Sequence, residues 1–269
     1  MDLWAADSHV HFHKCFDEGL FFDNSFDNLR KSDTTEIKSG ILFFTEGKNE
    51  DYFNQLSRKS KIRSTKSKLV EYSIDNSLGE NTLKLNDITT GAHLLLISGY
   101  QIVTKENLEV LSLGTKKRIN DGYSIENTIS DVQLSGGIAV LPWGFGKWLG
   151  HRGKKIDELI RKNISHLFLG DNGGRTSLLP FPVQFSDAVS LGIKILPGTD
   201  PLPFKSEVSR PLTYGFKFRA DVDKADPWPS IKNIMLDPKF NFEKFGHLVS
   251  PISFIKTQIA MQIKKRSTK

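Results

Sequence analysis

The sequence predicts an α/β fold, a distorted (β/α) barrel of TIM-like type. Short apolar runs of strand length recur along the chain, and helical patterns separate several of them, as in a parallel sheet that is open or closed into a barrel. The chain has 269 residues, of which 38% are hydrophobic and 25% charged, as in globular proteins. No repeat or low-complexity linker interrupts it. We therefore expect one domain over 1–269, with a barrel core of about 1–200 and an irregular extension of about 201–269.

The expected strands are apolar segments bounded by polar or turn residues. They cover residues 3–6, 40–45, 69–73, 94–98, 108–113, 138–141, 166–169 and 193–197. The expected helices cover residues 48–63, 124–134, 156–162 and 185–191. Ser124 is a typical N-cap for the second of these helices, and Gly136-Gly137 is a typical stop.

The middle and the end of the chain depart from strict alternation. Segments 82–85, 92–97 and 109–113 lie close together, with a turn at Thr89-Thr90-Gly91, which predicts an antiparallel hairpin inserted into the parallel sheet. Segment 201–229 is rich in proline and aromatic residues and lacks a clear period. We expect it to wrap the barrel or to cover its mouth.

The net charge of +6 permits an anionic partner, but the excess is concentrated in segments 58–68 and 264–269. Neither segment has the interleaved aromatic residues of a single-strand binding platform. A solvated helix face and a frayed terminus explain such runs. We therefore expect an anionic small-molecule substrate, with nucleic-acid binding as the minor alternative.

Several observations predict a cytoplasmic protein with no membrane partner. No segment approaches the roughly 20 apolar residues of a membrane-spanning helix. No basic region followed by an apolar core marks a signal peptide at the N-terminus. Cys15 is the single cysteine, so no disulfide can form within the chain.

The strongest chemical signal is Asp7-Ser8-His9-Val10-His11, which follows an apolar segment. Side chains alternate along a strand, so His9 and His11 point the same way and can share one cation. Imidazole is a common ligand of zinc, iron and related metals. Asp7 could be a further ligand or could accept a ring N–H, and His13 extends the series so that a surface histidine cluster is the alternative.

Other chemically capable residues follow the predicted strands, where the active sites of parallel α/β folds lie. Asp200 could hold a metal or act as the base, or could cap a turn. Glu46 could be a ligand or could cap the following helix. The remaining candidates are Glu109 as a ligand and the loop that contains Trp143. Lys147 and Arg175 could bind an anionic group or could be solvated surface cations.

Taken in order, these motifs resemble the PHP (polymerase and histidinol phosphatase) metal-dependent phosphoesterases. Asp7-Ser8-His9-Val10-His11 resembles the opening His-x-His of that family, and Gly198-Thr199-Asp200-Pro201-Leu202 resembles its final Gly-Ser-Asp-x-His. Other family positions differ here: Glu46-Gly47 stands for Asp-His, Gln101 for a bridging glutamate, Glu109 falls near an expected histidine, and Trp143 and Leu202 stand for two further histidines.

The resemblance implies a PHP-like barrel that binds a divalent metal (zinc, manganese or iron) and hydrolyses phosphoesters. The substitutions remove ligands, since glutamine lacks the charge to bridge two cations and tryptophan is not a ligand. We expect fewer ions than the three typical of the family, held by His9, His11 and Asp200 with Glu46 or Glu109. Asp200 would be the proton acceptor, with Lys147, Arg175 and Trp143 contacting the substrate. An amidohydrolase-type enzyme and an inactive binding or scaffold protein are the alternatives.

Overall fold

The computed structural model describes residues 1–33 and 37–267 of the chain, which form two β-sheets and seven α-helices. Sheet A has the strand order β13-β12-β1-β2-β6-β5-β4-β3, and sheet B has the order β11-β10-β9-β8-β7. The strands of sheet A are β1 (Asp2–Val10), β2 (Ser39–Phe44), β3 (Lys61–Arg63), β4 (Glu71–Asp75), β5 (Thr82–Asp87), β6 (Ala92–Ile97), β12 (Tyr214–Ala220) and β13 (Glu243–Gly246). Those of sheet B are β7 (Gly99–Val103), β8 (Glu109–Leu113), β9 (Ile138–Pro142), β10 (Leu167–Asn172) and β11 (Ile195–Gly198).

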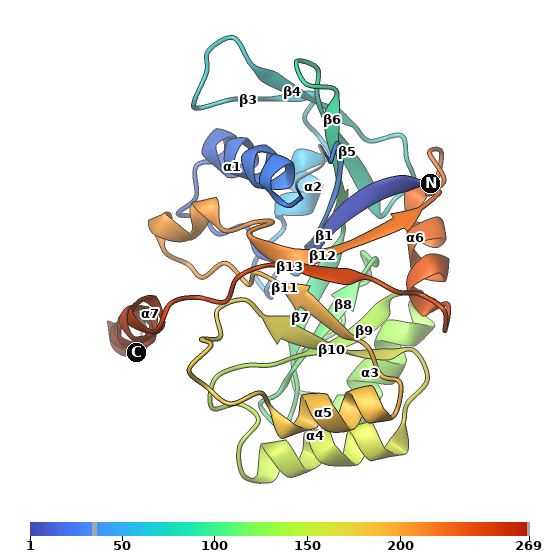
Figure 1. Cartoon of the computed structure of the whole chain (residues 1–269), viewed down its shortest axis with the longest axis vertical. Coiled ribbons are helices and arrows are strands. Elements are labelled where there is room, and N and C mark those ends of the chain that lie inside the picture. Colours follow the sequence, from blue (N-terminus) through green and yellow to red (C-terminus); the bar gives the residue numbers. More distant parts are fainter. Residues whose placement is uncertain (34–36, 268–269) are drawn as a thin grey trace.

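Five of the seven helices among the described residues cover the outer faces of the two sheets (Figure 1). The bounds of all seven are α1 (Glu18–Lys31), α2 (Tyr52–Leu56), α3 (Ile125–Leu134), α4 (His151–Lys162), α5 (Val183–Ser190), α6 (Pro227–Leu236) and α7 (Pro251–Ser267). Helices α1 and α2 lie against sheet A, whereas α3, α4 and α5 lie against sheet B. Among the described residues, no helix is long and apolar enough to cross a bilayer.

Alternation of side chains along the strands builds the layers. Ile41 and Phe43 of β2 face sheet B, while Leu42 and Phe44 face α1 and α2. Strand β9 behaves in the same way, with Val140 directed between the sheets and its neighbours directed at the helices of sheet B. The region between the two sheets is therefore a continuous apolar core, closed at one end by Trp228 of α6.

The two sheets do not close into the predicted barrel. The edge strands of sheet B, β11 and β7, lie beside β1 and β2. However, β12 and β6 already occupy the outer edges of the β1–β2 pair, so no hydrogen-bonded ladder between described strands joins the two sheets. Among the described residues, the backbone connections between the sheets are isolated, such as the bridge between Glu46 and Tyr100.

The predicted antiparallel insertion is confirmed. Strands β5 and β6 pair from Thr82 opposite Ile97 to Asp87 opposite Ala92, with the turn at Thr89-Thr90-Gly91 between them. Seven further expected strands also appear, with shifted ends. The predicted helix 48–63 is wrong over most of its length, because α2 covers only Tyr52–Leu56 and β3 follows it.

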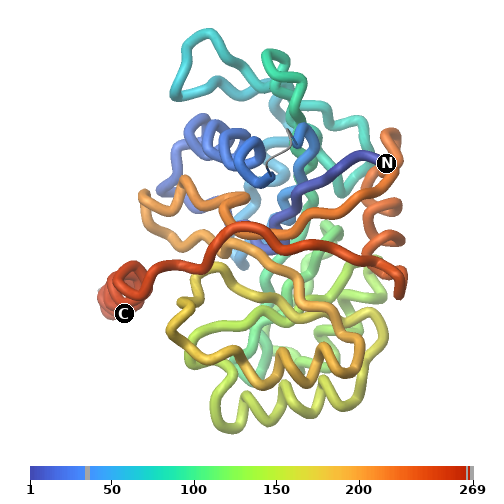
Figure 2. Tube along the Cα trace, in the orientation of Figure 1, coloured from blue at the N-terminus to red at the C-terminus, as the bar shows by residue number. Residues whose placement is uncertain are grey.

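The irregular extension predicted over 201–269 is also wrong. It contains β12, α6, β13 and α7, and β12 pairs antiparallel with β1 (Figure 2). Phe216 and Phe218 of β12 point into the core between the sheets. These alternating aromatic residues are a period-2 strand pattern that the surrounding prolines obscure. Residues 268–269 of the basic terminal run lie outside the described residues.

Candidate metal centre

The carboxyl end of β1 presents two imidazoles to one point. The Nε2 atoms of His9 and His11 lie 3.0 Å apart, and both side chains are buried. Strand β1 is buried along most of its length between β2 and β12, which fixes the direction of both rings. The register of β1 against β2 shifts between Asp7 and Val10, so the strand is irregular where the histidines emerge.

Two oxygen atoms from sheet B face the same point. Oε1 of Gln101 on β7 lies 3.2 Å from Nε2 of His9 and 3.3 Å from Nε2 of His11. Oδ1 of Asp200, just after β11, lies 3.5 Å from each of these nitrogens. The centre therefore forms where both edge strands of sheet B approach the end of β1.

This arrangement fits a divalent cation. Four ligands at about 2.0–2.1 Å from a tetrahedral ion stand about 3.3–3.4 Å apart. The five separations given above run from 3.0 to 3.5 Å. Two nitrogens and two oxygens without a shared cation or proton would present their lone pairs to one another in a buried space. Among the described residues, His9, His11 and Asp200 are the one group of histidine and acidic side chains with this convergence.

Burial keeps His9 ready to bind a cation. It lowers the pKa of His9 to about 4, despite the opposing charge of Asp200, so the ring is neutral near pH 7. Burial also opposes the charged form of His11, but the Glu50 and Asp200 carboxylates outweigh it and raise the pKa of His11 above its usual value. Burial likewise opposes ionisation of Asp200, yet His9, His11 and Lys147 hold the pKa of Asp200 below its usual range.

An outer layer of side chains holds these groups in place. Glu50 accepts a hydrogen bond from His13 at 3.1 Å and lies 3.8 Å from Nδ1 of His11, an atom with no hydrogen-bond partner among the described residues. A proton on this Nδ1 would face Glu50 and leave Nε2 free for a cation. Asn172, at the end of β10, donates a hydrogen bond to Oδ2 of Asp200.

The turn that carries Asp200 is fixed by Asp7. The buried Asp7 carboxylate accepts hydrogen bonds from the Thr199 amide at 2.9 Å, the Thr199 hydroxyl at 2.6 Å and the Leu212 amide at 3.0 Å. Asp7 thus holds the turn and does not face the rings as sequence reasoning had suggested. Asp200 has a left-handed backbone (φ 47°), and its amide donates to the His9 carbonyl at 2.8 Å.

Gly198 allows β11 to come this close to β1. A Cβ atom at this position would lie 2.6 Å from the His9 nitrogen and 2.7 Å from the His9 Cβ, far inside contact distance. The glycine therefore lets the backbone of β11 pass beside His9 and deliver Asp200 to the rings.

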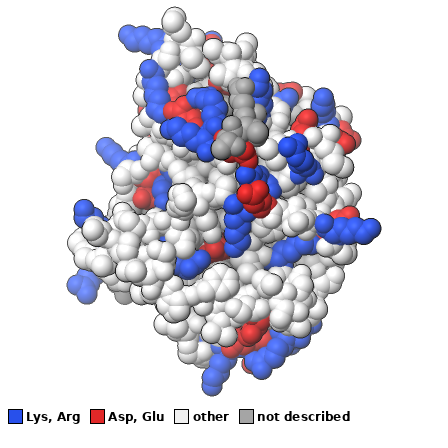
Figure 3. All heavy atoms as spheres, in the orientation of Figure 1, with Lys and Arg blue, Asp and Glu red and all other residues white. Residues whose placement is uncertain are grey.

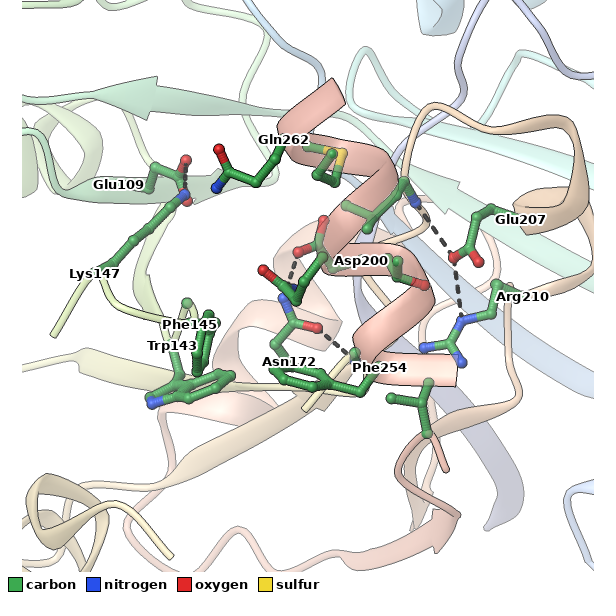
Figure 4. A pocket seen from close by; sticks show the side chains of 17 residues that line it. Glu109, Trp143, Phe145, Lys147, Asn172, Asp200, Glu207, Arg210, Phe254 and Gln262 are labelled. Carbon is green, nitrogen blue, oxygen red and sulfur yellow. Dashed lines mark hydrogen bonds and ion pairs between the residues drawn. The ribbon is translucent and has the colours of Figure 1, made fainter. Parts of the chain in front are cut away.

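A cavity of about 300 Å³ opens beside Asp200 (Figure 4). Its floor carries Asp200 and Asn172, and Trp143 and Phe145 form one wall. Lys147 points toward Glu109 and pairs with it, and Arg210 pairs with Glu207. Helix α7 runs across the cavity and contributes five side chains: Phe254, Thr257, Gln258, Met261 and Gln262.

The structure places the other predicted site residues as follows. The carboxylate of Glu46 is turned away from the imidazoles and accepts the Phe53 amide at 2.7 Å. Glu109 lines the cavity and pairs with Lys147, without joining the metal-binding group. Arg175 is buried in an ion pair with Asp171 at 3.1 Å and does not line the cavity, whereas Trp143 and Lys147 do.

Sequence reasoning did not assign a role to three residues of this centre. The sequence pattern marks Gln101 only as the replacement of a bridging glutamate, although an amide oxygen is also a ligand atom. Glu50 lies in a polar loop, and Asn172 lies in an ordinary turn sequence. The position of Asn172 at a strand end was the one available signal for it.

Comparison with known proteins identifies relatives of the fold. No protein-family model matches the chain, and no curated protein matches its sequence. Among solved structures, PsfC from Pseudomonas syringae PB-5123 aligns with a TM-score of 0.59 at 14% identity, over 97% of this chain and 99% of PsfC. PfuEndoQ from Pyrococcus furiosus, a lesion-specific endonuclease, aligns with a TM-score of 0.54 at 10% identity over 90% of this chain. The chain spans 57% of the length of PfuEndoQ. The protein therefore shares its α/β fold with these two proteins.

Proposed function

We propose that the protein is a divalent-metal-dependent hydrolase of phosphoesters. The observation that carries this proposal is the convergence of four ligand atoms from His9, His11, Gln101 and Asp200 on one buried point. The motif order that resembles the PHP phosphoesterases supports it. The shared fold with an endonuclease supports it too, because endonucleases cleave phosphodiesters.

The donor set suits one ion of zinc, manganese or iron, since two imidazoles, a carboxylate and an amide oxygen satisfy each of these metals. When bound, such an ion lowers the pKa of water and offsets charge on a phosphoryl oxygen. With Gln101 in place of a carboxylate, the centre has too little negative charge to hold a second cation beside the first.

The side chains around the ion would hold it, accept a proton and contact the substrate. Oδ1 of Asp200 faces the imidazoles and Oδ2 is held by Asn172, so Asp200 is better suited to hold the ion than to accept a proton. Glu109 lines the same cavity, and we assign the proton-acceptor role to it. Lys147, its partner, would contact an anionic substrate together with Trp143.

Metal analysis and phosphoester hydrolysis by matched variants test the proposal. We expect about one metal ion per chain and hydrolysis of p-nitrophenyl phosphate or bis(p-nitrophenyl) phosphate by the wild type. His9→Ala should lose both the metal and the activity. Glu109→Gln should lose activity and keep the metal, and Glu46→Gln, the control carboxylate outside the centre, should keep both.

Two results would contradict the proposal. Metal-free wild-type protein whose stability does not change in chelator would favour the scaffold alternative. Metal-loaded protein that hydrolyses cyclic amides and no phosphoester would favour the amidohydrolase alternative.

A further inference from the structure

Helix α7 has an exposed apolar face opposite the cavity. Ile252, Ile255, Ile259 and Ile263 are spaced by three or four residues, so they lie on one face of the helix, and each is between 55% and 68% exposed. We call this face the isoleucine stripe. The other face of α7 carries Phe254 and Met261 into the cavity, so the stripe is separate from the candidate centre.

Two neighbouring loops also expose apolar side chains. Phe145 is half exposed and packs edge-on against Phe254 at 5.1 Å between ring centroids, and the adjacent Leu149 is exposed. A bridge between Thr176 and Val249 ties the loop that carries the exposed Leu178 to the segment before α7. Exposed apolar residues gathered in this way mark an interaction surface more often than isolated ones do.

The charge on α7 is of one sign. Residues 251–269 include no aspartate or glutamate, whereas Lys256 and Arg266 of the same helix are exposed. In Figure 3 the lobe formed by α7 is mostly uncharged, with blue side chains at its rim. This combination complements an anionic surface.

A second copy of the chain is a poorer occupant of this face. Four partly covered isoleucines, each smaller than an aromatic side chain, offer roughly 400 Å² or less, about half of the ~800 Å² that each partner of a stable interface buries. Pairing two α7 helices would also bring their cations together.

We propose that the isoleucine stripe of α7 binds the surface of an anionic lipid membrane. The helix would lie in the interface, with the isoleucines among the acyl chains and with Lys256 and Arg266 at the headgroups. The expectation of no membrane partner rests on the absence of a membrane-spanning segment. A helix that lies on the membrane surface does not need such a segment. This proposal does not depend on the metal or on hydrolysis.

Co-sedimentation of the full chain with vesicles tests the proposal. We expect binding to vesicles of phosphatidylcholine with phosphatidylserine and much weaker binding to phosphatidylcholine alone. The double substitution Ile255→Gln/Ile259→Gln should weaken binding by about tenfold or more. Ile88→Gln, at an isoleucine that is 77% exposed on the β5–β6 turn, is the matched control and should bind like the wild type.

The measurement has clear contrary outcomes. Equal binding by the double variant and the wild type, or absence of vesicle binding by the wild type, would overturn the proposal. A concentration-dependent dimer of the wild type that the double variant loses, seen by analytical ultracentrifugation without vesicle binding, would assign the stripe to a second copy instead. Circular dichroism establishes that each variant is folded.

Discussion

At the scale of single residues, position 101 sets the charge of the candidate centre. Gln101 contributes an oxygen within 3.3 Å of both imidazoles but no charge. A carboxylate there would add a negative charge where a cation is expected to bind, and an aliphatic side chain would remove the ligand atom.

We therefore predict opposite effects for two substitutions of Gln101. Gln101→Glu should tighten metal binding by about tenfold or more, and Gln101→Leu should weaken it by a similar factor. Competition with a metal-sensitive dye measures both affinities. Unchanged affinity in both variants would mean that Gln101 does not contact the ion.

Glu50 should act through His11. Glu50→Gln removes the charge beside Nδ1 of His11 and should cost about 10- to 100-fold in metal affinity, as outer carboxylates do elsewhere. Glu80→Gln is the control, because Glu80 is an exposed glutamate on the turn before β5. An equal loss of metal affinity in both variants would mean that Glu50 acts through the overall charge of the protein and not through His11.

His93 should make stability depend on pH. Burial, aided by the charge of Lys84, lowers the pKa of His93 to about 4 from an ordinary value of 6.5. Between these values the unfolded chain binds a proton that the folded chain does not, so the free energy of unfolding should fall as the pH falls from 6.5 toward 4. Urea unfolding across this range should show a smaller fall in His93→Gln than in the wild type, and identical pH profiles would contradict the prediction.

Sequence alone could find the residues whose chemistry is specific and whose spacing is regular. His9 and His11 stand two apart on an apolar strand, and Asp200 ends a late strand, so their types and positions indicated a shared site. Glu46 and Glu109 followed the same rule but do not join the metal-binding group: the carboxylate of Glu46 accepts the Phe53 amide, and that of Glu109 pairs with Lys147 at the cavity. The direction of a side chain after a strand end depends on loop geometry that sequence does not specify.

At the scale of elements, the contact between β1 and β11 determines whether the centre can form. Gly198 is the residue that permits it, because even a methyl group there would meet the His9 backbone. Strand identities were largely predictable because a strand buried on both faces needs a short apolar run. Strand β12 was missed because its alternating aromatics lie among prolines, and helix 48–63 was overextended across a polar turn.

Gly198→Ala should separate β11 from β1. We expect a loss of about 1–3 kcal/mol in the free energy of unfolding, as for other overpacked sites, together with weaker metal binding because Asp200 moves from the rings. Denaturant unfolding and metal titration measure the two effects. Wild-type metal affinity in this variant would show that the approach of β11 is not required.

At the scale of the whole molecule, the candidate centre joins the two sheets, since His9 and His11 come from sheet A while Gln101 and Asp200 belong to sheet B. Sequence patterns predicted parallel strands and helices but not the division into two sheets. The division into two sheets depends on which strands pair with the outer edges of the β1–β2 pair. Strands β6 and β12 pair there, and both lie far from their partners in the sequence.

Removal of the metal should therefore weaken the whole fold. A ligand that binds only the folded state at about 100 times its dissociation constant adds about 2.7 kcal/mol. We expect chelator to lower the melting temperature of the wild type and to leave that of His9→Ala unchanged, as measured by calorimetry. An equal shift in both would point to an effect of the chelator unrelated to the centre.

The placement of β1 also has a consequence for biosynthesis. Ala5 pairs with Gly40 on one side and with Lys217 on the other. One edge of β1 therefore stays unpaired during synthesis until β12 has been made. Until then, a nascent chain exposes an unsatisfied strand that can recruit other chains. Products truncated before residue 214 should consequently aggregate during expression, and the slow formation of these distant pairs should limit the rate at which the finished protein refolds.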